Sequence, residues 1–148
     1  MLELLLVMAM ISMICGVGFL RLGDSLAEYE LSAAALELAA DLRWVQQVSV
    51  SSPSSAGGPF YLLTFRHADL SGYSISASTV SVKQATFPAS VRLANLPLKV
   101  SFNSNGNPDN PQTIALKSLR LAKKRYVIIA AVTGRVRISN TAGWEAGE

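Results

Sequence analysis

The hydrophobic pattern changes twice along the chain and divides it into three parts. Residues 4–20 form an uncharged and almost wholly apolar run. As a helix this run would be about 26 Å long, close to the thickness of a bilayer core. No later apolar run approaches the roughly 18 residues that a second span would need. The pattern therefore predicts one membrane-spanning helical segment in residues 1–20.

Residues 21–50 continue the helix with an amphipathic pattern. Apolar side chains recur at spacings of three and four residues, which places them on one face: Leu22, Leu26, Tyr29, Ala33, Leu36 and Ala40, broadened by Leu31, Leu38, Leu42 and Val45. We expect polar side chains on the opposite side, namely Asp24, Glu28, Glu37, Asp41 and Gln47. Because no proline interrupts residues 1–52, one helix over about residues 1–50 is predicted.

The turn-forming sequence of residues 51–59 (SSPSSAGGP) ends this helix and marks the start of a globular domain over 51–148. Beyond it, short runs with alternating or β-branched residues are typical of strands. The expected strands are 60–65, 73–77, 79–82, 91–93, 98–102, 113–116, 126–132 and 134–138, with an Asn-Gly turn inside 103–111. The sequence thus predicts an α+β fold in which one long N-terminal helix packs on an antiparallel domain of two small sheets.

Composition argues against catalysis and against a metal site. His67 is the only histidine and falls in a predicted turn, whereas Cys15, the only cysteine, falls in the apolar run as a core residue. No nucleophile motif is present. Alternating Asn and Asp side chains in 103–110 loosely resemble a calcium loop, but one carboxylate is too few, and the same residues suit a tight turn. We predict no enzyme, no cofactor and no catalytic or metal-binding residue.

Charge is distributed unevenly along the chain. Up to residue 70, seven acids face three bases, whereas residues 82–138 hold ten bases and one acid. This asymmetry suggests an anionic partner for the distal part, and the candidate DNA-binding residues are Lys123, Lys124, Arg125, Arg135 and Arg137. In a strand, Arg135 and Arg137 would share a face about 7 Å apart and could bridge phosphates. Alternatively, the arginines protect an edge strand or pair with acids of a neighbouring subunit.

Residues 1–9 (MLELLLVMA) resemble the N-terminal methylation motif of type IV pilins and type II secretion pseudopilins. The resemblance implies a leader cut by prepilin peptidase and an assembly role for Glu3, which would pair with the N-terminal amine of the adjacent subunit. From the residues alone, Glu3 could equally be a solvated carboxylate at the headgroup level. The family's leader, its cleavage-site glycine and a helix-kinking proline are not found in residues 1–21.

The distal part is similar to the H-type minor pseudopilin family, GspH with FimT-like minor pilins. Residues 100–106 (VSFNSNG) and 127–138, with TGRVR at 133–137, carry this likeness. It implies a pilin-like fold with a transmembrane and assembly half of the helix (1–20), an amphipathic half (21–50) and a GspH-like domain (51–148).

The resemblance also implies a function. The chain would be a structural minor pilin or pseudopilin, single-pass in the inner membrane with its C-terminal domain periplasmic or extracellular, and later part of a type IV pilus or type II secretion pseudopilus. Its partners would be other subunits, the inner-membrane assembly platform and prepilin peptidase. The alternative is a filament-borne minor pilin that binds DNA for natural transformation through Gly134, Arg135 and Arg137. Without a leader, a plain membrane-anchored binding domain is the remaining reading.

Overall fold

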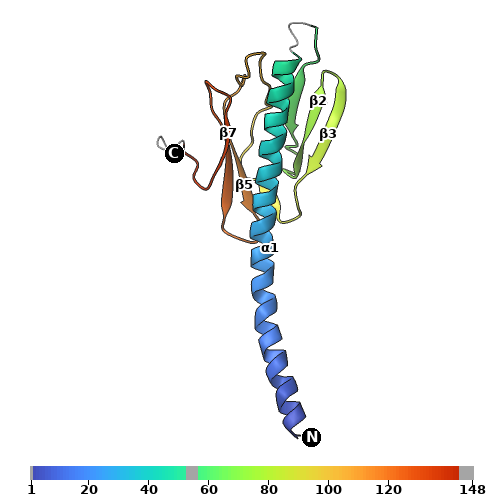
Figure 1. The fold of residues 1–148 in the computed structure, drawn as a ribbon, viewed down its shortest axis with the longest axis vertical. Helices are drawn as coiled ribbons and strands as arrows, with labels where there is room; N and C mark the ends of the chain where they lie inside the picture. Colours follow the sequence, from blue (N-terminus) through green and yellow to red (C-terminus); the bar gives the residue numbers. More distant parts are fainter. Residues whose placement is uncertain (1, 53–56, 144–148) are drawn as a thin grey trace.

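One long helix and two antiparallel sheets make up the protein. The computed structural model describes residues 2–52 and 57–143, with the side chains of these residues apart from 2 and 14–22. Helix α1 (Leu2–Ser51) extends away from the β-domain over its N-terminal half and packs against both sheets over its C-terminal half (Figure 1). This confirms the predicted α+β fold with one long N-terminal helix and two small sheets.

The strands form two sheets whose order follows the sequence. One contains β1 (Tyr61–Phe65), β2 (Gly72–Ala77) and β3 (Val80–Thr86); the other contains β4 (Val91–Leu93), β5 (Thr113–Ser118), β6 (Lys124–Ile129) and β7 (Val136–Ser139). All neighbouring strands are antiparallel. Strand β6 is central, lying between β5 and the edge strand β7.

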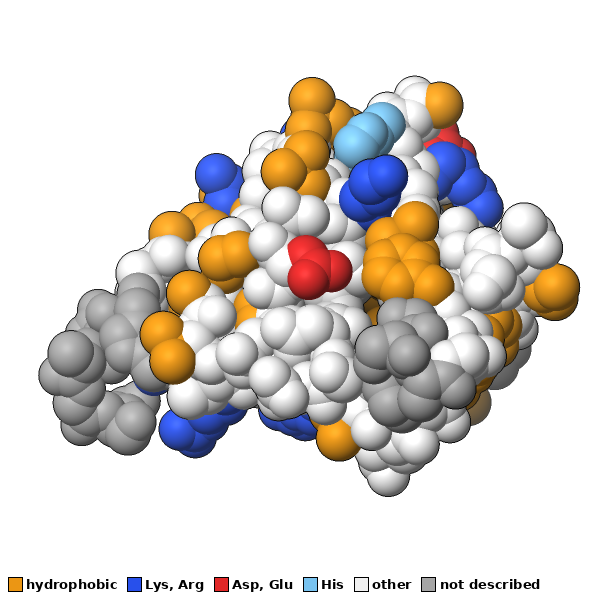
Figure 2. All heavy atoms as spheres, turned by 90° about the horizontal axis from the view of Figure 1, so that it is seen from above, with side chains coloured by type: hydrophobic (Ala, Val, Ile, Leu, Met, Phe, Trp, Pro, Cys, Tyr) orange, Lys and Arg blue, Asp and Glu red, His pale blue; other side chains and the backbone are white. Residues whose placement is uncertain are grey.

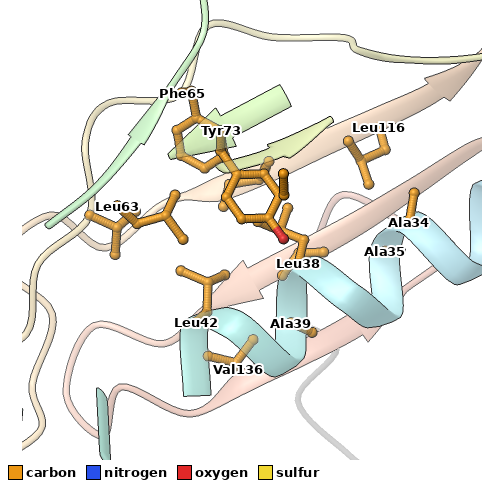
Figure 3. Close-up of a cluster of buried hydrophobic side chains, with 14 of the residues drawn as sticks. Ala34, Ala35, Leu38, Ala39, Leu42, Leu63, Phe65, Tyr73, Leu116 and Val136 are labelled. Atoms are coloured by element: carbon orange, nitrogen blue, oxygen red, sulfur yellow. The ribbon is translucent and has the colours of Figure 1, made fainter. Parts of the chain in front are cut away.

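The core lies between α1 and the two sheets. Small and large side chains alternate on the sheet-facing side of the helix, and the small ones let the strands approach closely: Ala27, Leu31, Ala34, Ala35, Leu38, Ala39, Leu42 and Val45 are all buried. Figure 3 shows Tyr73 of β2 directed towards Leu38, with Phe65 on its other side. Each large buried side chain stabilises the fold by about 1.5–3 kcal/mol, so this layer fixes both sheets on one helix.

The predicted strand 79–82 extends to Thr86 as β3, and three other predicted strands are shorter or irregular in the structure. Residues 98–102 form no regular strand, only the isolated bridges Leu63–Val100 and Phe102–Pro108. The side chain of Gln112 replaces ladder bonds there, because its amide accepts from the Leu98 N–H at 2.8 Å and donates to the Leu98 carbonyl at 2.7 Å. Strand β6 ends at Ile129, and Val132 is 80% exposed in the following turn. Strand β7 begins at Val136, after the glycine and arginine expected to open it.

Some predictions concern residues outside those described. The burial of Cys15 falls on a residue whose side chain is not described. Within the described part of the chain, no helix has a window both long and apolar enough to span a membrane. The predicted span includes residues 14–20, whose side chains lie outside that part, so it stays a prediction.

Candidate assembly surface and basic clusters

The side of α1 that faces away from the sheets carries a second apolar stripe. This outward stripe consists of Leu26, Tyr29, Ala33, Leu36 and Ala40. Tyr29 is 72% exposed and Leu36 is 60% exposed. The expectation that these residues and Leu38 share one face was wrong, because two positions along a helix correspond to a rotation of about 200°. The helix is therefore apolar on two opposite sides, and its own sheets cover only one of them.

The N-terminal half of α1 extends this exposed apolar surface. Among the side chains described there, Leu4, Leu5, Leu6, Val7, Met8, Met10, Ile11 and Met13 are all at least half exposed. Glu3 lies in the first turn of the helix, is exposed, and has no ion-pair partner among the described residues. In the single chain, the predicted assembly carboxylate Glu3 therefore lies at the end of α1 that is distant from the β-domain, next to exposed apolar side chains.

Carboxylates on one flank of α1 pair with cations of the turn between β5 and β6. Arg120 Nε donates to Asp24 Oδ1 at 3.0 Å, and Lys123 Nζ donates to Glu28 Oε2 at 2.8 Å. Arg125 lies 4.0 Å from the same Glu28 carboxylate. The hydrogen bond from Lys123 holds the pKa of Glu28 below its usual value. The candidate DNA-binding residues Lys123 and Arg125 are therefore already engaged by this chain's own helix.

On the other flank, Asp41 joins α1 to the β1–β3 sheet. Its Oδ2 accepts from the Tyr73 hydroxyl at 2.6 Å and from Lys83 Nζ at 2.6 Å, while Glu37 lies 3.2 Å from the same ammonium. Burial, and then the bond to Asp41, raise the pKa of Tyr73; the bond to Asp41 is the main cause that raises the pKa of Lys83. The amphipathic pattern of α1 predicts Asp41 and Glu37 on the side opposite its apolar face, and it does not predict this Asp41 cluster.

The sheet divides the predicted basic group into two. Lys124 lies opposite Lys117 and Arg125 opposite Leu116, so these neighbours point to different faces of the sheet. Arg137 lies opposite Ile128, and the Arg135 carbonyl accepts from the Ala130 N–H at 3.1 Å. Six residues of strand separate Lys124 from Ala130, or about 20 Å. We call Arg120, Lys123, Lys124 and Arg125 the basal cluster, and Arg135 with Arg137 the distal pair.

Arg135 lies in the turn before β7, so the strand does not include it. It is exposed, whereas Val136 is buried and Arg137 is half-buried. This alternation places the two arginines on the same side of the chain, as predicted. The prediction that both belong to one rigid strand was wrong by one residue, because the 131–133 turn is closed by the Gly134 N–H bonding to Ala130 O at 3.0 Å.

Two glycines, one from residues 100–106 and one from residues 127–138, lie against each other at the distal end of the domain. Gly106 and Gly134 both have positive φ, 81° and 63°. A Cβ on Gly134 would lie 2.1 Å from the Gly106 carbonyl oxygen, which also accepts from Gln46 Nε2 at 2.7 Å. The glycines therefore have a structural role: they let the 103–107 turn, the β6–β7 turn and the helix come together, and they position Arg135.

The remaining candidates have local structural partners. His67 Nε2 lies 2.9 Å from the Pro97 carbonyl. In the suspected calcium loop, Asn103 Oδ1 accepts the N–H groups of Asn105 and Asn107, each at 3.0 Å, and Asp109 is bonded to Ser101. Across the residues described, no group of three or more His, Cys, Asp or Glu side chains could hold a metal ion. These oxygens close a turn.

Comparison with known proteins extends the description of the fold. No family model matches the sequence, and no curated protein sequence matches it. The structure is similar to two crystal structures of the type IV minor pilin FimU from Pseudomonas aeruginosa. One has a TM-score of 0.59 and 21% identity and covers 76% of this chain and 90% of FimU; the other has a TM-score of 0.54 and 18% identity and covers 74% and 92%. The chain thus has the fold of a type IV minor pilin.

Proposed function

We propose that this chain is a structural minor pilin or pseudopilin subunit. It inserts as a single-pass protein in the inner membrane, with the β-domain on the periplasmic or extracellular side, and assembles into a type IV pilus or a type II secretion pseudopilus. The observation that carries this proposal is the apolar surface left uncovered along α1 in the described side chains, at residues 4–13 and in the outward stripe between Leu26 and Ala40. The pilin fold supports it.

Two environments would cover this surface in turn. Leaving a large apolar side chain in water forgoes about 1.5–3 kcal/mol, so the N-terminal half of α1 requires lipid while the subunit waits for assembly. The helices of neighbouring subunits then replace lipid in the filament and also cover the outward stripe. There an unpaired Glu3 carboxylate would cost several kcal/mol, and pairing with a neighbour's N-terminal amine would fix the axial position of the subunit.

The test separates insertion from assembly. We expect Glu3→Ala to leave membrane insertion intact and to reduce incorporation into sheared filaments, measured by pull-down. Glu37→Ala, which removes an exposed carboxylate from the β-domain half of the same helix, is the matched control. Replacing Tyr29 and Leu36 together by Gln should give a folded subunit that also enters filaments poorly. Full incorporation of Glu3→Ala would contradict the proposed role of Glu3.

A second candidate function is DNA binding for uptake in natural transformation. The observation that favours it is the distal pair: Arg135 is exposed, and it lies on the same side of the chain as Arg137 at the sheet edge. A pair of guanidinium groups there suits contacts to the phosphates of duplex DNA, independent of sequence and sensitive to salt. Lys123 and Arg125 contribute less, because Glu28 offsets their charge.

This candidate is tested by gel shift of a short DNA duplex with the full chain in detergent. Arg135→Ala combined with Arg137→Ala should abolish most binding. Lys123→Ala combined with Arg125→Ala removes the same charge and should change binding much less. Absence of any shift by the unmodified chain at low salt would reject DNA binding.

A further inference from the structure

The turn between β5 and β6 lies where the projecting half of α1 leaves the β-domain (Figure 1). The contacts Asp24–Arg120 and Glu28–Lys123 place it there. Along the helix, Asp24 and Glu28 follow Leu20, the last residue of the apolar run, by about 6 Å and about 12 Å. If residues 4–20 span a bilayer, the turn is therefore held at or just above the headgroup layer.

The side chains of this turn suit a membrane surface. Leu119 is 58% exposed at the start of the turn, and Arg120, Lys123 and Lys124 of the basal cluster are exposed around it. An exposed apolar side chain flanked by cations is the pattern of surfaces that contact anionic lipids. The opposite end of the molecule differs, since Figure 2 shows cationic, acidic and apolar side chains scattered over that end without a basic cluster.

A cavity beside the turn provides a site for an anionic group. Its volume is about 300 Å³, and it is lined by Glu28, Leu31, Lys123, Lys124, Arg125 and Asn140. Lys123 and Arg125 together carry one positive charge more than Glu28, and Lys124, whose side chain starts from the other face of the sheet, adds a further charge at the edge of the cavity. In the part of the chain that the structure describes, the ammonium of Lys124 has no ion-pair partner, so its charge is available to a ligand.

We propose that the basal cluster binds the phosphate of an anionic lipid headgroup in the leaflet next to the β-domain. Lys124 supplies the unpaired charge, Lys123 and Arg125 share theirs between Glu28 and the phosphate, and Leu119 enters the interface. The inference rests on the proposed function, because only an inserted chain brings the turn to a membrane. Such binding would orient the β-domain on the bilayer before the subunit enters a filament.

The experiment uses the full chain in vesicles of phosphatidylcholine with increasing phosphatidylglycerol. Flotation in pure phosphatidylcholine first reports insertion, and hydrogen exchange of the backbone amides of residues 119–125 then reports headgroup binding. We expect phosphatidylglycerol to protect these amides, and raised salt to weaken the protection. Lys123→Gln with Lys124→Gln should raise the lipid fraction needed for half-protection by up to about twenty-five-fold, roughly fivefold for each cation. Arg135→Gln with Arg137→Gln, an equal charge loss at the distal end, should leave it unchanged.

The other outcomes are distinguishable. Failure to float in phosphatidylcholine would overturn the proposed membrane insertion itself. Flotation without protection by phosphatidylglycerol would overturn only the headgroup site. Equal protection by inorganic phosphate over phosphatidylcholine vesicles would identify a free phosphate site, and protection by duplex DNA alone would identify a nucleic-acid site; both results would overturn the lipid assignment.

Discussion

The two sheets are attached to the same helix by different contacts. Asp41, whose side chain is 15% exposed, binds both Tyr73 and Lys83 of the β1–β3 sheet. Glu28, whose side chain is 43% exposed, pairs with Lys123 and Arg125 at the start of β6. Ion pairs gain strength where water is excluded and lose it where water competes. The ionic contact of Asp41 therefore holds the β1–β3 sheet on the helix. In the β4–β7 sheet, by contrast, Lys123 and Arg125 can exchange Glu28 for another anion.

The β4–β7 sheet has its firm attachment at the opposite end. There Gln46 Nε2 donates to Gly106 O at 2.7 Å, and Arg43 donates to the Val136 carbonyl at 3.0 Å. Gly134 packs directly on the Gly106 carbonyl. A sheet held rigidly at the distal end and by exposed charges at the basal end can present the basal cluster to a ligand without loss of the fold.

The largest expected effect comes from Asp41→Ala. Removing this carboxylate leaves the Tyr73 hydroxyl and Lys83 without their principal partner, and we expect a loss of about 3 kcal/mol in unfolding free energy, at the low end for breaking a buried pair. The measurement is chemical unfolding of the full chain in detergent. Glu37→Ala is the control, since Glu37 binds the same ammonium but its side chain is 57% exposed. Equal losses in the two variants would show that burial does not distinguish these carboxylates.

Gly134→Ala should follow, with a loss of about 2 kcal/mol. The added Cβ would lie 2.1 Å from a backbone oxygen and would also strain a residue with φ of 63°. Gly57→Ala separates the two causes, because Gly57 has φ of 84° but no described atom within 4 Å of the new Cβ. The same unfolding measurement applies, and equal effects of the two substitutions would exclude the close contact as a cause.

The Asp41 cluster should also make stability sensitive to alkali. The pKa values of Tyr73 and Lys83 are both raised in the folded state, so their contribution is complete below the unfolded pKa of about 10 and is lost as pH rises beyond it. Tyr73→Phe should cost about 1–2 kcal/mol at pH 7 and make the loss of stability above about pH 10 shallower. Parallel pH profiles for Tyr73→Phe and the unmodified chain would contradict this assignment.

The smallest effect is expected for Glu28→Gln. The pKa of Glu28 is lowered in the folded state, so its contribution is present above the unfolded pKa and is lost as pH falls below about 4.5. Because this carboxylate is exposed, we expect the melting temperature at neutral pH to remain nearly unchanged and to respond little to salt. A fall in melting temperature as large as that caused by Asp41→Ala would show that the contacts of Glu28 and Asp41 do not differ in strength.

Much of the fold could be predicted from local sequence. The absence of proline in residues 1–52 gave the helix, and turn-forming residues located its end within two residues of Ser51. Alternating and β-branched runs located seven strands, although residues 98–102 did not pair regularly. There the side chain of Gln112, distant in sequence, supplies the hydrogen bonds of a missing neighbour. Local sequence patterns do not show that a distant side chain will take the place of a neighbouring strand.

The candidate sites were harder to predict. A run of basic residues indicated an anionic partner, but cross-strand register decided that Lys124 and Arg125 point to different faces and that the distal pair lies elsewhere. Glu28, Asp41 and Gln46 were missed because their partners are distant in sequence. The sequence indicated only that these polar residues lie beside the apolar faces of α1, where they could reach the strands.

The amino-acid sequence by itself determined the long helix, its apolar N-terminal half and the strand-rich domain, because hydrophobic periodicity and turn residues act over a few neighbouring positions. Only the tertiary structure decided which apolar side of α1 is covered. Both sides are apolar, and the sheet-facing side has the small residues that permit close packing and the flanking carboxylates that meet cations of the strands. Because the sheets pack on that side, the outward stripe stays exposed, and the proposed assembly depends on this exposed surface.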